Sequence, residues 1–230
     1  MSLSRVKINF MASTDLSSET RSRILETAWE HVRERGVDAV SVKEIAAAAG
    51  VSRQLIYFHY GNRAGLLLAM ARHQDRRSGF GHRVAAAREL PPVEAFDALI
   101  RAWCEYVPQL LPVARALEAA LITGDEGGAA WQDRFGELHR VFRHALERVA
   151  RHGRLAPGWS VETATDWAWA RAQPSQWDYL VSMRSWSPDD WVERMTRSVS
   201  GELVSPGPSR KPSGASGSAA RQPRTDPGIA

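Results

Sequence analysis

The sequence predicts an all-α fold. From residue 18 to about residue 203, apolar residues recur at helical spacing, and no alternating β-branched run bounded by turns interrupts them. A glycine turn between two short helical segments marks residues 41–60. The chain has 230 residues, of which 43% are hydrophobic and 24% charged, so it is long enough to bury a sizeable core.

The first two expected helices have clear boundaries. The first runs from Ser18 to Arg35 and stops at Gly36. The second begins after Ser41, which can cap it while Glu44 reaches back, forming a capping box that contributes about 1 kcal/mol. The expected buried stripes are Ile24, Leu25, Ala28 and Val32 in the first helix, and Val42, Ile45, Ala46 and Ala49 in the second.

The turn AGVS leads to a third helix that ends near Tyr60. Gly50 suits this turn because it takes positive φ without Cβ strain, and Ser52 can cap the helix that follows. Consecutive helical residues point about 100° apart, so the aromatic run YFHY cannot face one core. We expect Ile56 and Tyr60 to pack inward. The side chains left facing outward are Arg53, Gln54, Tyr57, Phe58 and His59.

A fourth helix is expected to begin near Arg63, and a boundary marked by Gly and Pro follows at 79–92. Pro174 removes a backbone hydrogen bond and should end or kink a helix near Ala172. The later helices are expected at 93–107, 109–122, 128–153, 160–173 and 188–203. The segment GDEGG at 124–128 is expected to be a polar loop between helices.

The two ends of the chain lack helical apolar spacing. We expect residues 1–17 to be a flexible arm and residues 205–230, rich in Pro, Gly and Ser, to be a disordered basic tail. The formal net charge is +4, and the tail supplies about three of these positive charges. Because the rest of the chain is close to neutral, any nucleic-acid contact must come from a local surface.

Residues 20–67, TRSRILETAWEHVRERGVDAVSVKEIAAAAGVSRQLIYFHYGNRAGLL, resemble the DNA-binding domain of TetR-family transcriptional regulators. The resemblance lies in the Ile-Leu pair of the first helix, the glycine before the second, the IAAAAGVS turn and the aromatic third helix. In such a helix-turn-helix, the last helix enters the DNA major groove.

The resemblance implies which residues contact DNA. Gln54 is suited to the N6 and N7 atoms of adenine, and Arg63, where relatives commonly have Lys, keeps the charge for a phosphate contact. The contacts implied are Ser41, Val42, Lys43, Ser52, Arg53, Gln54, Tyr57, Phe58, His59 and Arg63.

The resemblance also implies a helix-turn-helix domain at 18–63 and a larger helical regulatory and dimerisation domain at 64–204. The last two long helices of each subunit would form the interface of a homodimer. We expect the apolar face of the last helix to join the subunits, because a monomer would leave it partly bare. That face comprises Trp191, Val192, Met195 and Val199.

A ligand pocket within the central helices is also implied, and its apolar residues favour a mostly apolar effector. The alternative is that these side chains fill one another's space and leave no cavity. The candidates are Phe96, Trp103, Tyr106, Leu117, Leu121, Trp131, Phe135 and His139. For the late tryptophans at 159, 167, 169, 177, 186 and 191, packing is favoured over an aromatic-lined pocket.

Other classes find little support in the sequence. We find no catalytic or nucleotide-binding motif, Cys104 is the one cysteine, and His139 and His144 are five residues apart, which does not stack them as metal ligands. No apolar run is long enough to span a membrane, and no secretory signal is evident. We therefore expect a cytoplasmic protein that is not an enzyme and uses no cofactor or metal.

These observations predict a sequence-specific transcriptional regulator, a repressor released from a near-palindromic operator by a small, mostly apolar ligand. The alternative is an architectural or sequence-tolerant DNA-binding protein without an effector, in which the tail provides most of the affinity. Deleting residues 205–230 distinguishes the two hypotheses.

Overall fold

The computed structural model describes residues 16–124 and 126–205, and within these ranges the chain forms helices and no strand. The helices are α1 (Ser18–Arg35), α2 (Val42–Ala48), α3 (Arg53–Tyr60), α4 (Arg63–Arg77), α5 (Phe80–Arg88), α6 (Pro92–Thr123), α7 (Glu126–Arg151), α8 (Val161–Arg171), α9 (Ser175–Trp177), the π-helical turn η1 (Asp178–Ser182) and α10 (Pro188–Leu203). The predictions for residues 1–15 and 206–230 lie outside the described residues.

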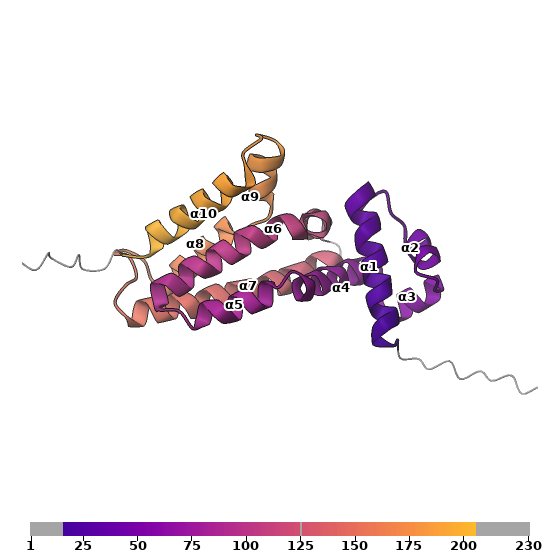
Figure 1. Cartoon of the computed structure of the whole chain (residues 1–230), viewed down its shortest axis with the longest axis horizontal. Helices are drawn as coiled ribbons and strands as arrows, with labels where there is room; N and C mark the ends of the chain where they lie inside the picture. The colour runs from indigo at the N-terminus through magenta and orange to yellow at the C-terminus, as the bar shows by residue number, and fades with distance from the viewer. Residues whose placement is uncertain (1–15, 125, 206–230) are drawn as a thin grey trace, which may run out of the picture.

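Helices α1, α2 and α3 form a head at one end of the molecule, and α5 to α10 form the helical core at the other (Figure 1). Helix α4 leaves the head and packs against both α6 and α7, so it belongs to both parts. Helix α6 lies at the centre of the core, in contact with α4, α5, α7 and α10. The all-α prediction is confirmed.

The local signals of the head act as the sequence predicts. The backbone N–H of Ser41 donates to the Glu44 carboxylate at 2.8 Å, and the N–H of Glu44 donates to Oγ of Ser41 at 3.2 Å. Ser52 caps α3 by accepting from the N–H of Leu55 at 3.1 Å. Gly50 in the turn has φ +66°, a conformation that side chains with a Cβ rarely adopt.

The expected helices at 93–107 and 109–122 form the single helix α6, which continues through Pro108 and Pro112. The prediction of two separate helices is therefore wrong. Each interior proline costs a helix about 3 kcal/mol. Burying an aliphatic side chain stabilises the fold by about 1.5–3 kcal/mol. A continuous helix keeps Val107, Leu110 and Val113, all fully buried, on one face against the core, and this burial outweighs the prolines.

The boundary expected at 79–92 contains a helix, α5, which sequence reasoning missed. Its apolar spacing is weak, with Val84 and Ala87 as its buried residues, and Gly79 before it has φ +70°. The helix is held by tertiary packing on α6, where the ring of Phe80 stacks on Tyr106 with centroids 4.8 Å apart. Such a contact between distant segments leaves little trace in local spacing.

The predicted effect of Pro174 is confirmed, because α8 ends at Arg171 with Ala172 as its C-cap. The carbonyl of Ala172 instead accepts a hydrogen bond from Nε1 of Trp103 at 2.8 Å. After the break the chain forms α9 and η1, neither of which was predicted. The proline therefore reshapes the segment between α8 and α10.

The apolar face of α10 is already covered within one chain. Trp191 is 2% exposed and packs edge-on against Trp177, with ring centroids 5.0 Å apart. Val192, Met195 and Val199 are also buried, and α10 packs on α6. The expectation that a monomer would leave this face bare is wrong, because the face belongs to the subunit core.

Candidate nucleic-acid interface and effector cavity

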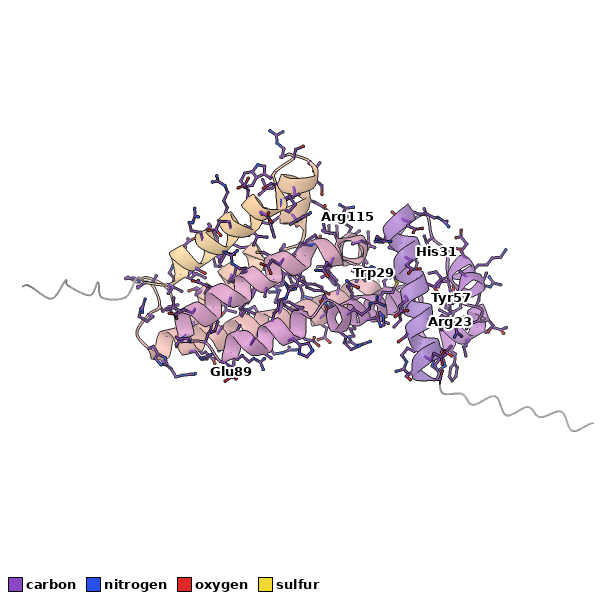
Figure 2. The ribbon with its side chains drawn as sticks, in the orientation of Figure 1. Arg23, Trp29, His31, Tyr57, Glu89 and Arg115 are labelled. Carbon is purple, nitrogen blue, oxygen red and sulfur yellow. The ribbon has the colours of Figure 1, made fainter. Side chains whose placement is uncertain are left out.

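The outward face of α3 is a candidate surface for nucleic acid. Ile56 is 1% exposed and fixes the helix to the head. Tyr57 and Phe58 are 46% and 64% exposed, and Arg53 and Gln54 on the same helix are exposed as well. Tyr57 lies at the end of the molecule remote from α10 (Figure 2). The structure thus brings together four of the five side chains expected to face outward.

The start of α2 and the cap of α3 border this face. Lys43 is exposed, and so are Ser41 and Ser52, although the hydroxyls of both serines are used as helix caps. The side chain of Val42 is 6% exposed and packs in the core of the head. Its assignment as a side-chain DNA contact is therefore corrected.

Arg63 also differs from expectation. Its Nη1 donates to the carbonyl of Val40 at 2.6 Å, and its Nη2 donates to the carbonyl of Val37. The guanidinium thus ties the start of α4 to the segment between α1 and α2. A phosphate contact through the same N–H groups would compete with these bonds, so Arg63 is held toward the head in this structure.

Two further arginines that sequence reasoning missed hold the head together. Nε of Arg23 donates to the carbonyl of Ala49 at 3.1 Å, which fixes α1 to the end of α2. Nη2 of Arg35 lies 2.7 Å from Oε1 of Glu44. Hydrogen bonds from Arg35 and Ser41 lower the pKa of Glu44 to about 2, so the capping carboxylate stays ionised at neutral pH. No local motif marks these contacts.

His59 and Tyr60 lie at the end of α3, and both are half-buried. The ring of His59 meets Phe58 edge-on, with centroids 5.0 Å apart. Nε2 of His59 and the hydroxyl of Tyr60 are buried with no hydrogen-bond partner among the described residues. Tyr60 packs against the core as expected, whereas His59 is less accessible than Tyr57 and Phe58.

In the core, a cavity of about 130 Å³ lies between α4, α5, α6 and α7. Two of the expected pocket residues, Trp103 and Phe135, line it, with ring centroids 5.7 Å apart. The other lining residues are Asp75, Phe80, Arg134, Glu137, Leu138 and Val141. Asp75, Phe80 and Arg134 were missed, because α5 was not predicted and the end of α4 meets α7 only in the folded chain.

Asp75 and Arg134 in the wall of this cavity belong to a polar network. Nη1 and Nη2 of Arg134 donate to the two carboxylate oxygens of Asp75, each at 2.6 Å. The Tyr106 hydroxyl donates to the same carboxylate. Burial, reinforced by the Asp75 charge, raises the pKa of Tyr106, so its hydroxyl stays protonated.

The remaining pocket candidates lie elsewhere. Phe96, Tyr106 and Trp131 are at most 1% exposed and pack within the core. Leu117 lines a separate groove of about 860 Å³ between the head and α6. Leu121 is 44% exposed, and His139 pairs with Asp166 at 2.9 Å. Of the late tryptophans, Trp177 and Trp191 are buried and none lines the cavity, in agreement with packing.

The chain matches the family model described as "Bacterial regulatory proteins, tetR family" over residues 24–70. It is similar to the HTH-type transcriptional repressor BepR of Brucella suis, with 28% identity over 64% of this chain and 74% of that protein. It is also similar to the HTH-type transcriptional repressor AcnR of Corynebacterium efficiens, with 28% identity over 63% of this chain and 73% of that protein. Residues 24–70 therefore carry the signature of the TetR family's DNA-binding domain.

Solved structures support the TetR fold. The NalD repressor of Pseudomonas aeruginosa aligns with a TM-score of 0.57 and 24% identity, covering 82% of this chain and 98% of that one. A protein of Saccharomonospora viridis, crystallised with choline, aligns with a TM-score of 0.67 and 18% identity, covering 83% and 100%. These likenesses show an N-terminal helix-turn-helix domain followed by a larger helical domain.

The TetR-family match includes α2, α3 and the first half of α4, and it ends before Asp75. The candidate DNA surface therefore lies in the part that carries the family signature, whereas the cavity does not. The relatives are named as transcriptional repressors, which agrees with the expectation that this chain is not an enzyme. Within the described ranges, no helix could span a membrane and no side-chain cluster suits a metal ion.

Proposed function

We propose that the chain is a DNA-binding transcriptional repressor of the TetR family that works as a homodimer in the cytoplasm and leaves a near-palindromic operator when a small, mostly apolar molecule binds. The observation that carries the proposal is the outward face of α3, where Arg53, Gln54, Tyr57 and Phe58 are exposed on a helix held by its buried Ile56. A helix of this kind in a helix-turn-helix presents its side chains to base edges and phosphates.

The exposed residues divide into two roles. Arg53 and Gln54, in the first turn of α3, are suited to bidentate hydrogen bonds with base edges in the major groove. Tyr57 and Lys43 are suited to phosphate contacts, which position the head without reading sequence. Ser41 and Ser52 place their helix N-termini at the same surface, and backbone N–H groups there favour phosphate.

For the homodimer, we propose the outward faces of α8 and α10, since the inward face of α10 is buried on α6. Trp167 on α8 is 37% exposed, and its Nε1 donates to the Glu202 carboxylate on α10 at 3.0 Å. This bond joins the two helices into one surface. An isologous interface there gives the two-fold symmetry that a near-palindromic operator requires.

The cavity beside Trp103 is the proposed effector site. Its volume of about 130 Å³ is similar to that of an engineered apolar cavity, about 150 Å³, that binds benzene. A larger effector must therefore open the cavity. Asp75 lies in its wall near the end of α4, and α4 begins at the head, so opening the cavity would act on the helix that positions α3.

Footprinting on the DNA that flanks the gene for this protein tests the proposed function. We expect protection of a near-palindromic site, lost in Arg53→Ala and retained in Arg140→Ala, which removes an exposed charge from α7. Removing residues 205–230 should leave specific protection intact. If that deletion abolishes binding to all DNA, the sequence-tolerant alternative is favoured.

A further inference from the structure

A hollow of about 300 Å³ lies at the junction of α1, α3 and α4, separate from the cavity in the core. Its lining includes Arg21 of α1 and Arg72 and Arg76 of α4, together with His59 and Tyr60 at the end of α3. The other lining residues are apolar, and none is a carboxylate. We call this hollow the arginine pocket.

The three guanidinium groups of the arginine pocket have no partner in the part of the chain that the structure describes. This sets them apart from Arg77, the neighbour of Arg76, which pairs with Glu26 at 2.5 Å. Three positive charges around one hollow repel one another, and an anion placed between them would relieve that repulsion. The pocket therefore carries a charge that the described residues do not compensate.

Two polar groups in the wall point to the same ligand chemistry. Nε2 of His59 and the hydroxyl of Tyr60 are both buried without a hydrogen-bond partner. Both atoms are able to donate a hydrogen bond, and buried donors in native proteins are normally satisfied. The charge of Arg21 acts on the Tyr60 hydroxyl, lowering a pKa that burial raises more strongly. The arginines and the unsatisfied donors thus belong to one local environment.

We propose that the arginine pocket binds a phosphate group. Its oxygens would accept charge-assisted hydrogen bonds from the guanidinium forks of Arg21, Arg72 and Arg76. The phosphate could belong to a free phosphorylated small molecule or to DNA that flanks the recognised half-site. In either case it would join the end of the recognition helix to α4. The DNA form of this inference rests on the proposed function, and the free form does not.

Calorimetric titration of the full-length protein with inorganic phosphate and with pyrophosphate, at constant ionic strength, tests the free form. The test variant is Arg72→Gln/Arg76→Gln, and the control is Arg140→Gln, an exposed arginine on α7 that does not line the pocket. We expect the test variant to lose about tenfold in affinity for each arginine removed, while the control binds like the natural sequence.

DNA duplexes with long and with trimmed flanks around the half-sites test whether the phosphate belongs to flanking DNA. If a flanking phosphate occupies the pocket, the test variant binds the long duplex more weakly than the control does, and binds the trimmed duplex equally well. If the protein binds phosphate but neither duplex, the arginine pocket is supported as a phosphate site and the proposed function is contradicted. The inference is overturned if the test variant matches the control with phosphate, pyrophosphate and both duplexes.

Discussion

Arg134 on α7 donates two hydrogen bonds of equal length, 2.6 Å each, to the carboxylate of Asp75 on α4. The side chain of Arg134 is 10% exposed and that of Asp75 is 26% exposed. Because α4 begins at the head, this pair fixes the helix that follows the recognition helix to α7 in the core.

Breaking this pair should destabilise the fold. Arg134→Met leaves the Asp75 charge partly buried, and we expect a loss of about 2–4 kcal/mol in the free energy of unfolding, measured by urea denaturation. The double variant Arg134→Met/Asp75→Asn should recover part of this loss, because no uncompensated charge remains. Equal stability of the single variant and the natural sequence would show that the pair contributes nothing.

DNA affinity should depend steeply on salt. A dimer that neutralises about 6–10 phosphates loses about 10³–10⁵ in affinity between 50 and 200 mM salt. Tyr57→Phe should weaken binding to specific and random duplexes alike. Gln54→Ala should instead reduce the preference for particular bases, with a loss of about 1–3 kcal/mol in discrimination. Fluorescence anisotropy on both duplexes measures this. Identical effects of the two substitutions would contradict the division into positioning and reading residues.

The two faces of α10 should respond differently to substitution. Trp191→Ala removes a buried indole and should cost about 3–5 kcal/mol of subunit stability in urea denaturation. Trp167→Ala should instead shift the dimer toward monomer, as seen by sedimentation velocity of the protein without residues 205–230. A Trp167→Ala protein that remains dimeric at micromolar concentration would place the interface elsewhere.

The contribution of Glu118 to stability should fall as the pH rises toward neutrality, because burial, together with the nearby Asp178 charge, raises the pKa of Glu118 from 4.5 to about 7. The folded state binds this proton more tightly than the unfolded chain does, so the stabilisation present at pH 4.5 is lost as the pH rises to 7. After discounting for solvent screening, Glu118→Gln should be more stable than the natural sequence at pH 8 by about 1–2 kcal/mol.

The matched control for this effect is Glu89→Gln, at an exposed carboxylate (Figure 2). Urea denaturation at pH 5 and pH 8 should show a pH-dependent difference for Glu118→Gln and none for Glu89→Gln. A Glu118→Gln protein with the same pH dependence as the natural sequence would rule out Glu118 as the cause.

An effector in the core cavity should quench Trp103, which lines it. Screening hydrophobic compounds by intrinsic fluorescence should find ligands whose signal disappears in Trp103→Phe and persists in Trp131→Phe, since Trp131 is buried but does not line the cavity. These ligands should also release the operator, because an effector shifts the equilibrium only by binding the DNA-incompetent form better. Ligands that quench Trp103 without releasing the operator would support the cavity as a binding site and contradict its regulatory role.

The head is the part that the sequence by itself determines most completely. The capping box of Ser41 and Glu44, the positive φ of Gly50 and the cap at Ser52 are interactions between residues at most four apart, so a local pattern identifies them. The same is true of the end of α8, where Pro174 breaks the helix through its own covalent geometry.

Tertiary structure decided the features that depend on residues far apart in the chain. Helix α6 continues through Pro108 because of what its flanking residues bury, and the face of α10 is covered because α6 lies against it. Arg63 binds carbonyl groups more than twenty residues earlier, and Asp75 meets Arg134 across the core. Local spacing reports which side of a helix is apolar, whereas the identity of the surface that covers it depends on the packing of the whole chain.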